Sequence, residues 1–338
     1  MTFNFALIGT GRIGKVHAQN IMTAIPEATI TAVADVYADG AAAVAEQYGI
    51  GFHTSDHMAA INHEGVDAVL IASSTDTHAP FIIDAAKAGK HIFCEKPIAS
   101  DLSKIDEALA VVDAAGVKLQ IGFNKRFDPT FQRIKAAITN GEIGTPHRLH
   151  VISRDPAPPP ISYIEVSGGL FFDMTIHDFD ISRFLLGEVE EVYAAGAVLV
   201  DPAIGDAGDI DSAVITLRFA NGAIGTIENS RQAVYGYDQR VEVFGSGGSA
   251  SNGNIFTNTV TVKTESNVQR GGMPLHFFLE RYMEAYRLEV VAFVDAVLND
   301  KPIPVTGADG RAPVVIAMAA NRSLQENRPV RLDEIEGA

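Results

Sequence analysis

The chain has 338 residues, of which 47% are hydrophobic and 20% are charged, a composition typical of a globular protein large enough for two cores. Its 26 Lys and Arg against 42 Asp and Glu give a formal net charge of −16, which disfavours nucleic acid and anionic membrane surfaces as partners. The single cysteine, Cys94, excludes an internal disulfide, and no apolar run reaches the roughly 18 residues of a membrane helix. Because the first apolar residues break at glycines and follow no basic segment, we expect a core strand there, not a signal peptide, and a cytoplasmic protein.

The first part of the chain alternates strictly between short apolar strands and segments with helical periodicity. Strands are expected at 3–9, 28–35, 66–73, 90–95 and 117–123, and helices at 14–25, 38–49, 78–89 and 103–116. Such alternation indicates a parallel sheet with helices on both faces. We therefore predict an α/β Rossmann domain, a doubly wound parallel sheet, over residues 1–123.

The pattern changes after about residue 145, where strand-like runs follow one another with little helix between them. Strands are expected at 148–153, 190–200, 212–219, 223–232, 239–245 and 259–265, and amphipathic helices at 279–300 and 310–327. Segments 155–160, 201–209 and 244–254 are interpreted as loops. We predict an α+β domain over residues 124–338, with a large open, mainly antiparallel sheet and C-terminal helices that can pack back on the first domain.

A glycine motif lies between the first predicted strand and the first predicted helix. Gly9, Gly11 and Gly14 form G-x-G-x-x-G, whose glycines allow the tight turn, the approach of a pyrophosphate and the packing of helix on strand. Asp35 ends the next strand, where a carboxylate accepts from both ribose hydroxyls of NAD and repels the 2′-phosphate of NADP. The motif favours NAD, although Arg12 could pair with a 2′-phosphate or stack on the adenine.

Residues 167–187 are spaced like a buried helix but carry several charges. Asp173 and His177 lie four residues apart and would share a helix face, with Asp180 further along the same side. A histidine oriented by a carboxylate is suited to proton transfer near neutral pH. The alternatives are an ordinary ion pair on a helix surface and a divalent metal site, to which Asp178 would add a third carboxylate.

Several motifs together resemble one enzyme family. "FCEKP" (93–97) follows a predicted strand, at the sheet edge where open α/β sheets bind ligands. With the glycine motif, "SSTDTHAP", "GFNKRFDP" and "GGLFFDMTIHDFD", it is similar to the family of glucose-fructose oxidoreductase and inositol dehydrogenase over nearly the whole chain. "NKRFDP", "SRDPAPPP" and "YGYDQ" resemble the inositol 2-dehydrogenases most.

The resemblance implies a set of functional residues. The implied catalytic residues are Lys96, Asp173 and His177, with Lys96 donating to the reacting oxygen of the substrate. The implied cofactor contacts are Gly9, Gly11, Arg12, Ile13, Gly14, Asp35, Ser73, Ser74, Thr75, His78, Glu95 and Lys96. The implied substrate contacts are Lys96, Asn124, Arg126, Arg154, Asp155, Asp173, His177 and Tyr237. NAD is the expected cofactor, and no metal is expected.

We accordingly expect an NAD-dependent dehydrogenase that oxidises a secondary hydroxyl of a cyclic polyol, with myo-inositol converted to its 2-keto product, scyllo-inosose. Another inositol isomer or an aldose is the alternative substrate. A non-catalytic NAD-dependent sugar sensor is the alternative of a different class, and it should lack at least one of Lys96, Asp173 and His177. Apolar residues on both alternations of the second-domain strands, together with the resemblance, predict a homo-oligomer, a tetramer.

Overall fold

A computed structural model describes residues 2–336, apart from the side chains of residues 267–270. Met1, Gly337 and Ala338, at the ends of the two expected domain ranges, lie outside the described residues. The chain divides into two compact units. The first comprises the residues up to Phe127 together with Glu284–Ala312, and the second comprises Asp128–Met283 together with the residues from Pro313 on.

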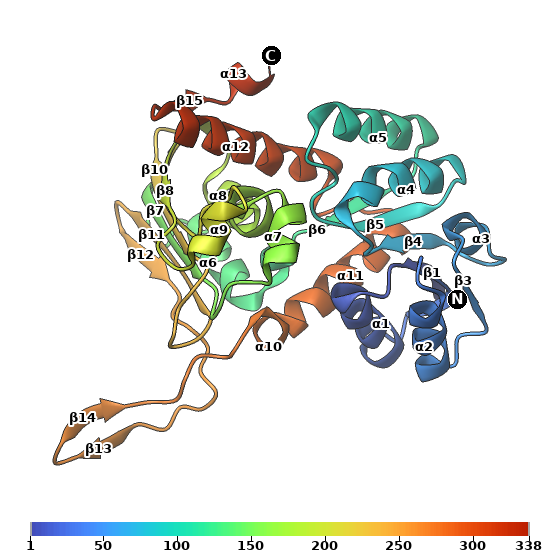
Figure 1. The fold of residues 1–338 in the computed structure, drawn as a ribbon, viewed down its shortest axis with the longest axis horizontal. Helices are drawn as coiled ribbons and strands as arrows, with labels where there is room; N and C mark the ends of the chain where they lie inside the picture. Colours follow the sequence, from blue (N-terminus) through green and yellow to red (C-terminus); the bar gives the residue numbers. More distant parts are fainter. Residues whose placement is uncertain (1, 337–338) are drawn as a thin grey trace. The chain divides into compact units, whose positions relative to one another are not determined.

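The first unit contains a parallel sheet of six strands in the order β3-β2-β1-β4-β5-β6 (Figure 1). This is the strand order of a dinucleotide-binding Rossmann fold, so the predicted fold class of this unit is confirmed. The central strands are continuous apolar runs because helices cover both faces of a parallel sheet. The strands are β1 (Phe3–Ile8), β2 (Ala28–Ala34), β3 (Phe52–Thr54), β4 (Ala68–Ile71), β5 (His91–Glu95) and β6 (Leu119–Gly122).

Some helices of the first unit begin or end at typical capping residues. Asp101 caps α5 by accepting from the backbone N–H of Ser103, and Gly49 ends α2 in the left-handed conformation. Strand β3 and helix α3 were not predicted, because three and five residues carry too little periodicity. The helices are α1 (Arg12–Ala24), α2 (Ala38–Tyr48), α3 (His57–Ile61), α4 (Thr75–Lys87), α5 (Leu102–Ala115), the 3₁₀ turn η1 (Asn124–Phe127) and α11 (Met283–Leu298).

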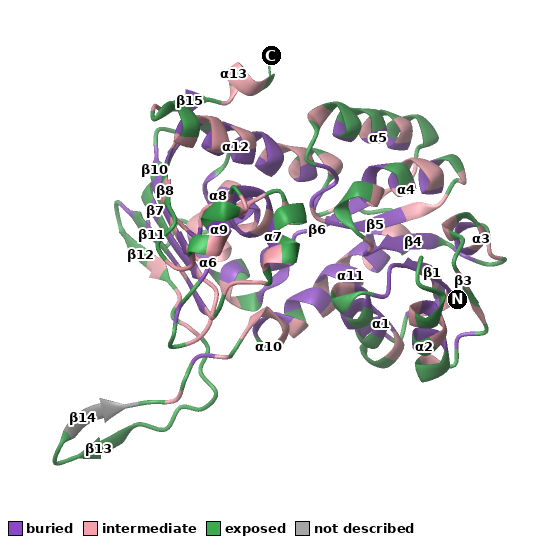
Figure 2. Ribbon diagram, in the orientation of Figure 1, coloured by how far each residue is buried: buried purple, intermediate pink, exposed green. Residues whose placement is uncertain are grey.

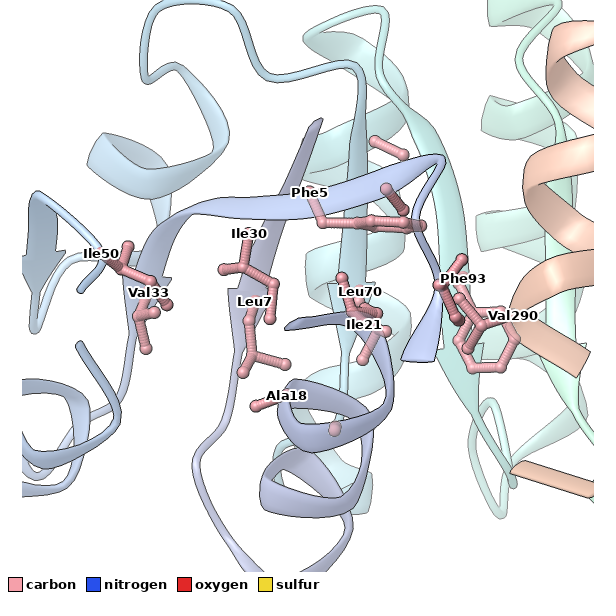
Figure 3. Packing of buried hydrophobic residues seen from close by; sticks show 14 of the residues in the cluster. Phe5, Leu7, Ala18, Ile21, Ile30, Val33, Ile50, Leu70, Phe93 and Val290 are labelled. Carbon is pink, nitrogen blue, oxygen red and sulfur yellow. The ribbon is translucent and has the colours of Figure 1, made fainter. Parts of the chain in front are cut away.

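The core of the first unit joins the sheet to α11, which comes from a distant part of the chain. Phe293 of α11 lies 6.0 Å from the ring of Phe5 and 5.9 Å from the ring of Phe93, measured between centroids. Val290 belongs to the same buried cluster, part of which Figure 3 shows. Each buried ring removes a large apolar area from water, so α11 is an integral part of this core.

The second unit contains a seven-stranded mixed sheet in the order β12-β11-β7-β10-β9-β8-β15. Strands β7 and β10 run parallel, and the other neighbouring pairs of this sheet are antiparallel, as predicted for a mainly antiparallel sheet. Strands β13 and β14 form a separate hairpin. The strands are β7 (Pro146–Arg154), β8 (Val189–Ala197), β9 (Ser212–Phe219), β10 (Ile224–Ser230), β11 (Asp238–Gly245), β12 (Gly248–Ser251), β13 (Val262–Thr264), β14 (Asn267–Arg270) and β15 (Val330–Arg331).

One face of this sheet is buried and the other is open, which gives the alternating colours of its strands in Figure 2. In β9, for example, Ile215 is buried and its neighbour Val214 is exposed. The helices of this unit are α6 (Pro129–Thr139), α7 (Ile161–Ser167), the π-turn η2 (Phe171–Thr175), α8 (Ile176–Leu186), α9 (Pro202–Asp206), α10 (Phe278–Arg281), α12 (Gly307–Glu326), which begins in the first unit, and α13 (Asp333–Glu336).

Two segments interpreted as loops contain regular structure. Within 201–209, Pro202–Asp206 form helix α9, because Asp201 accepts from the N–H of Ala203 and proline is favourable in a first helical turn. Within 244–254, Gly248–Ser251 form the edge strand β12, paired with β11 after a tight turn. Its small residues carry no hydrophobic alternation, so the pattern could not reveal it. No helix within residues 2–336 is long and apolar enough to cross a membrane.

Candidate active site

The glycine turn between β1 and α1 has the geometry of a phosphate cradle. Gly9 has a φ of +95°, and a Cβ there would lie 2.5 Å from the backbone nitrogen of Ser73. A Cβ on Gly14 would lie 2.0 Å from the carbonyl oxygen of Gly9. At Gly11, by contrast, no described atom lies within 4 Å of such a Cβ. Two of the glycines are therefore required by packing, and the third leaves open backbone where helix α1 begins, which fits a pyrophosphate.

Asp35, at the end of β2, is oriented by this turn. Its Oδ2 accepts from the backbone N–H of Thr10 at 2.6 Å and from the Thr10 hydroxyl at 2.7 Å, and its Oδ1 accepts from the N–H of Tyr37 at 2.8 Å. Burial opposes ionisation, but these hydrogen bonds outweigh it and hold the pKa of Asp35 below its usual value. The carboxylate is thus fixed beside the cradle, while Arg12 and the neighbouring Tyr37 are exposed.

The loop from β4 into α4 contains Ser73, Ser74 and Thr75, which are partly or fully exposed at the carboxyl edge of the sheet. His78 is buried and links two loops at this edge, since its Nδ1 lies 2.7 Å from the carbonyl oxygen of Pro97 and its Nε2 lies 3.2 Å from that of Ser73. Burial lowers the pKa of His78, which favours the neutral ring. A neutral ring carries a single N–H, so His78 can donate to only one of these two carbonyl oxygens at a time.

Lys96 follows strand β5 and precedes Pro97 across a cis peptide bond. It is partly buried, whereas Glu95 before it points into the unit and hydrogen-bonds the Nε2 of His17 at 2.7 Å. His17, Glu95 and Glu289 offer ligand-type atoms that all lie within 4.8 Å of one another, in a fully enclosed position. Glu95 bonds His17 directly, whereas the Nδ1 of His17 and both carboxyl oxygens of Glu289 have no hydrogen-bond partner among the described residues.

Two further predicted residues lie in the turn η1, which follows β6. Asn124 and Arg126 are both buried, and the Nη2 of Arg126 donates to the Oδ1 of Asp309 at 3.0 Å. Burial of Asp309 is outweighed by the charge of Arg126 and by hydrogen bonds from Thr306, so the pKa of Asp309 is lowered. Arg126 is therefore held in place by an ion pair within the first unit.

In the second unit, the charged segment begins with the π-turn η2 and continues as α8. The regular helix expected over this segment is therefore interrupted. Thr175 ends this turn, and its hydroxyl donates to the Oδ1 of Asn229 at 2.7 Å, with the carbonyl oxygen of Leu170 further away at 3.3 Å. π-turns of this kind are frequent at functional sites, since they change which side chains share a helix face.

The three aspartates and the histidine of this segment differ in exposure. Asp173 and His177 are partly exposed, whereas Asp178 and Asp180 are completely buried. The Oδ2 of Asp178 accepts from the Nδ2 of Asn229 at 2.9 Å, which attaches α8 to β10. Asp173 and His177 are therefore the members that can meet a substrate.

Asp173 also has partners that no motif indicated. Tyr163 donates its hydroxyl to Oδ1 of Asp173 at 2.8 Å, and the fully buried Arg231 donates from Nη1 to Oδ2 at 3.0 Å. The second amino group of Arg231 donates to Asp209 at 3.2 Å. These three residues come from separate segments of the sequence, so no local pattern could have joined them to Asp173.

The other predicted substrate contacts in the second unit lie on or after β7 and before β11. The guanidinium of Arg154 pairs with Glu228 and donates to the hydroxyl of Tyr235 at 2.6 Å, on the open side of the sheet. Asp155 is partly exposed, with its backbone bonded to Ser230 and Ala233. The ring of Tyr237 packs edge-on against Phe277 at 5.4 Å. Arg154 thus lies on the face of the sheet opposite to Asn229 and α8.

Comparisons with known proteins match both units to one family. Residues 3–123 match the oxidoreductase family with an NAD-binding Rossmann fold, and residues 131–251 match the GFO/IDH/MocA C-terminal domain. The chain is 51% identical to the uncharacterized oxidoreductase YrbE of Bacillus subtilis, over 98% of this chain and 96% of that protein. It is 49% identical to the myo-inositol 2-dehydrogenase of Thermotoga maritima, over 98% and 99%. A solved scyllo-inositol dehydrogenase of Lactobacillus casei, with bound NAD(H) and scyllo-inositol, is 30% identical, with a TM-score of 0.92 over 98% of this chain and 99% of that one.

Proposed function

The chain belongs to the GFO/IDH/MocA oxidoreductase family, with an NAD-binding Rossmann domain, and we propose that it oxidises myo-inositol to scyllo-inosose with NAD. The observation that carries this proposal is the full-length similarity to a myo-inositol 2-dehydrogenase, at 49% identity. Lys96, Asp173 and His177 are all present, which favours an enzyme over a sugar sensor on the same fold.

The proposed roles follow from the chemistry of each side chain. Bound NAD supplies the hydride acceptor. His177 takes the proton of the substrate hydroxyl as general base, and Asp173 orients its ring and stabilises the imidazolium. Lys96 donates to the same oxygen as negative charge develops on it. The glycine turn, Asp35 and the loop at Ser73 bind the cofactor, with Asp35 selecting NAD by accepting from the ribose hydroxyls.

The remaining predicted contacts stay proposals for substrate binding. A polyol ring presents many hydroxyls, and each needs a fixed donor or acceptor to compete with water. Asn124 and Arg126 are buried, and Asp309 holds Arg126 in place, whereas Asp155 and Tyr237 are partly exposed. Arg154 is proposed with them, although it lies on the open face of the sheet, opposite α8, and its guanidinium already has partners in its own unit.

We further propose that the protein is a cytoplasmic homotetramer assembled through the open face of the seven-stranded sheet of the second unit. Val214, Ile224 and Phe244 are exposed there, at 54%, 45% and 41% of their surface. Large apolar side chains on one open face are typical of a surface that a partner covers.

The proposed function is tested by measuring NADH formation with purified protein across a panel of neutral polyols: myo-inositol, scyllo-inositol, other inositol isomers and aldoses. We expect the highest kcat/KM with myo-inositol and NAD. A higher kcat/KM with scyllo-inositol or an aldose would reassign the substrate within the same reaction class. NAD binding without NADH formation from any of these compounds would instead favour the sensor.

A further inference from the structure

We propose that Arg231 is a positioning residue for the reaction, which holds the Asp173 carboxylate in the orientation that His177 requires. The inference rests on the proposed function, since it concerns the same acid/base pair. Arg231 directly follows strand β10 and is completely buried, and its backbone N–H donates to the carbonyl of Asp211 at 2.8 Å. Its side chain therefore starts from a fixed point in the sheet.

The guanidinium lies between two carboxylates. Nη1 donates to Oδ2 of Asp173 at 3.0 Å, and Nη2 donates to Oδ2 of Asp209 at 3.2 Å. Both carboxylates are mostly buried, with side-chain exposures of 16% and 11%. Ion pairs in such surroundings are weakly screened, and removing one partner leaves uncompensated charge. Without Arg231, two carboxylates would share this site with no cation between them.

Tyr163 completes the fixation of Asp173. Its hydroxyl donates to Oδ1 of Asp173 at 2.8 Å, so each carboxylate oxygen receives a hydrogen bond from a different direction. A carboxylate held by two donors, one of them cationic, cannot rotate freely. The orientation of the Asp173 carboxylate is therefore fixed, as its proposed role toward His177 requires.

Asp209 connects the same guanidinium to the backbone that carries Asp173. Its Oδ1 accepts from the N–H of Leu170, immediately before η2, at 3.0 Å. Gly169 has a φ of +87°, and a Cβ there would lie 3.0 Å from the same Asp209 oxygen. Arg231 therefore fixes Asp173 twice: directly through its carboxylate and indirectly through the start of the turn. If Arg231 only stabilised the fold, its pair with Asp209 would be enough; its second pair, with Asp173, involves the proposed acid/base residues.

The test is Arg231→Met, which retains an unbranched buried side chain and removes all donors. We expect kcat for inositol oxidation to fall about 10²-fold, the scale of a small misplacement of a reacting group, with the Kd for NAD changed less than about twofold. Because Arg231 acts through Asp173, Arg231→Met should lower kcat little further when added to Asp173→Asn. Arg183→Met is the matched control, since it removes a bidentate pair with Glu188 at the other end of α8 and should leave kcat nearly unchanged.

Unchanged kcat in Arg231→Met, or separate losses from Arg231→Met and Asp173→Asn that multiply in the double variant, would overturn the inference. If Arg231→Met does not fold, Asp209→Asn tests the same role, because it keeps the side-chain volume and weakens only the ion pair that holds the Arg231 guanidinium. It should then lower kcat at least threefold while leaving NAD affinity unchanged, and an unaltered kcat would refute the role. If the unmodified protein oxidises no inositol, the proposed function and this inference both fail. If it oxidises inositol and only the variants contradict the expectation, the inference alone fails.

Discussion

Replacing Glu289 with glutamine should remove a large part of the pH dependence of stability. Glu289 lies on α11 with no exposed surface, and neither of its carboxyl oxygens has a hydrogen-bond partner among the described residues. The ionisable groups facing it are Glu95 of β5 and His17 of α1, and His17 also packs against Tyr286 at 5.8 Å. Burial, reinforced by the charge of Glu95, raises the pKa of Glu289 well above its usual value of 4.5.

The sign of the effect follows from where the proton is bound. Above pH 4.5 the unfolded chain loses the proton of Glu289, while the folded chain keeps it up to its raised pKa. The folded state binds more protons in this window, so the free energy of unfolding falls as pH rises, by about 1.4 kcal/mol per pH unit at most. Glutamine occupies the same volume and carries no proton to lose. The stability of Glu289→Gln relative to the unmodified protein should therefore increase with pH.

The assay is urea unfolding of both proteins, monitored by circular dichroism from about pH 5 to pH 9. Glu284→Gln is the control, because Glu284 lies on the same helix but is exposed and paired with Arg287. Its stability should follow that of the unmodified protein throughout. Parallel stability curves for Glu289→Gln and the unmodified protein would show that Glu289 is ionised in the folded state, which would refute the reasoning.

Three other expectations concern cofactor, chemistry and assembly. Asp35→Ser should lower kcat/KM for NAD about 10-fold to 100-fold and reduce the preference for NAD over NADP, because a charged hydrogen-bond acceptor is lost. Equal kcat/KM for NAD and NADP in the unmodified protein would contradict the role of Asp35. His177→Ala should lower kcat about 10²-fold to 10⁴-fold with little change in NAD affinity, and turnover at the unmodified rate would exclude it as the base. Light scattering should give a tetramer, and a 36.0 kDa monomer at micromolar concentration would exclude assembly through the sheet.

The Rossmann sheet could be predicted because its signals are local. Strands buried on both faces are continuous apolar runs, as in β4, where all four residues are buried. The glycine motif lies where β1 meets α1, and Asp35 follows β2, so spacing alone located the turn that we propose binds the cofactor. Edge elements such as β3 and β12 were missed because they are short and partly or largely exposed, which removes the hydrophobic pattern that prediction requires.

The candidate catalytic pair could be found because charges are unexpected in an apolar helical segment. The residues that hold this segment in place could not be predicted. Arg231 is 58 residues from Asp173 in sequence, and Asn229 is 54 residues from Thr175, so both contacts exist only after the sheet has formed. Thr175 of the π-turn donates its hydroxyl to that same Asn229, so the turn also has a partner on a strand that is distant in sequence. Helix propensity alone would have favoured a regular α-helix through this segment.

The end of strand β10 contacts the segment formed by η2 and α8 at two places. Asn229 and Arg231 are two residues apart, so their side chains leave the strand on the same face. Asn229 donates to the buried Asp178, and Arg231 donates to the partly exposed Asp173. The strand end therefore holds a carboxylate on either side of His177 in the sequence, so the positions of Asp173 and Asp178 depend on the sheet as well as on the helix. The buried Asp178 thus has a structural role, and the partly exposed Asp173 is the carboxylate that we propose takes part in the reaction.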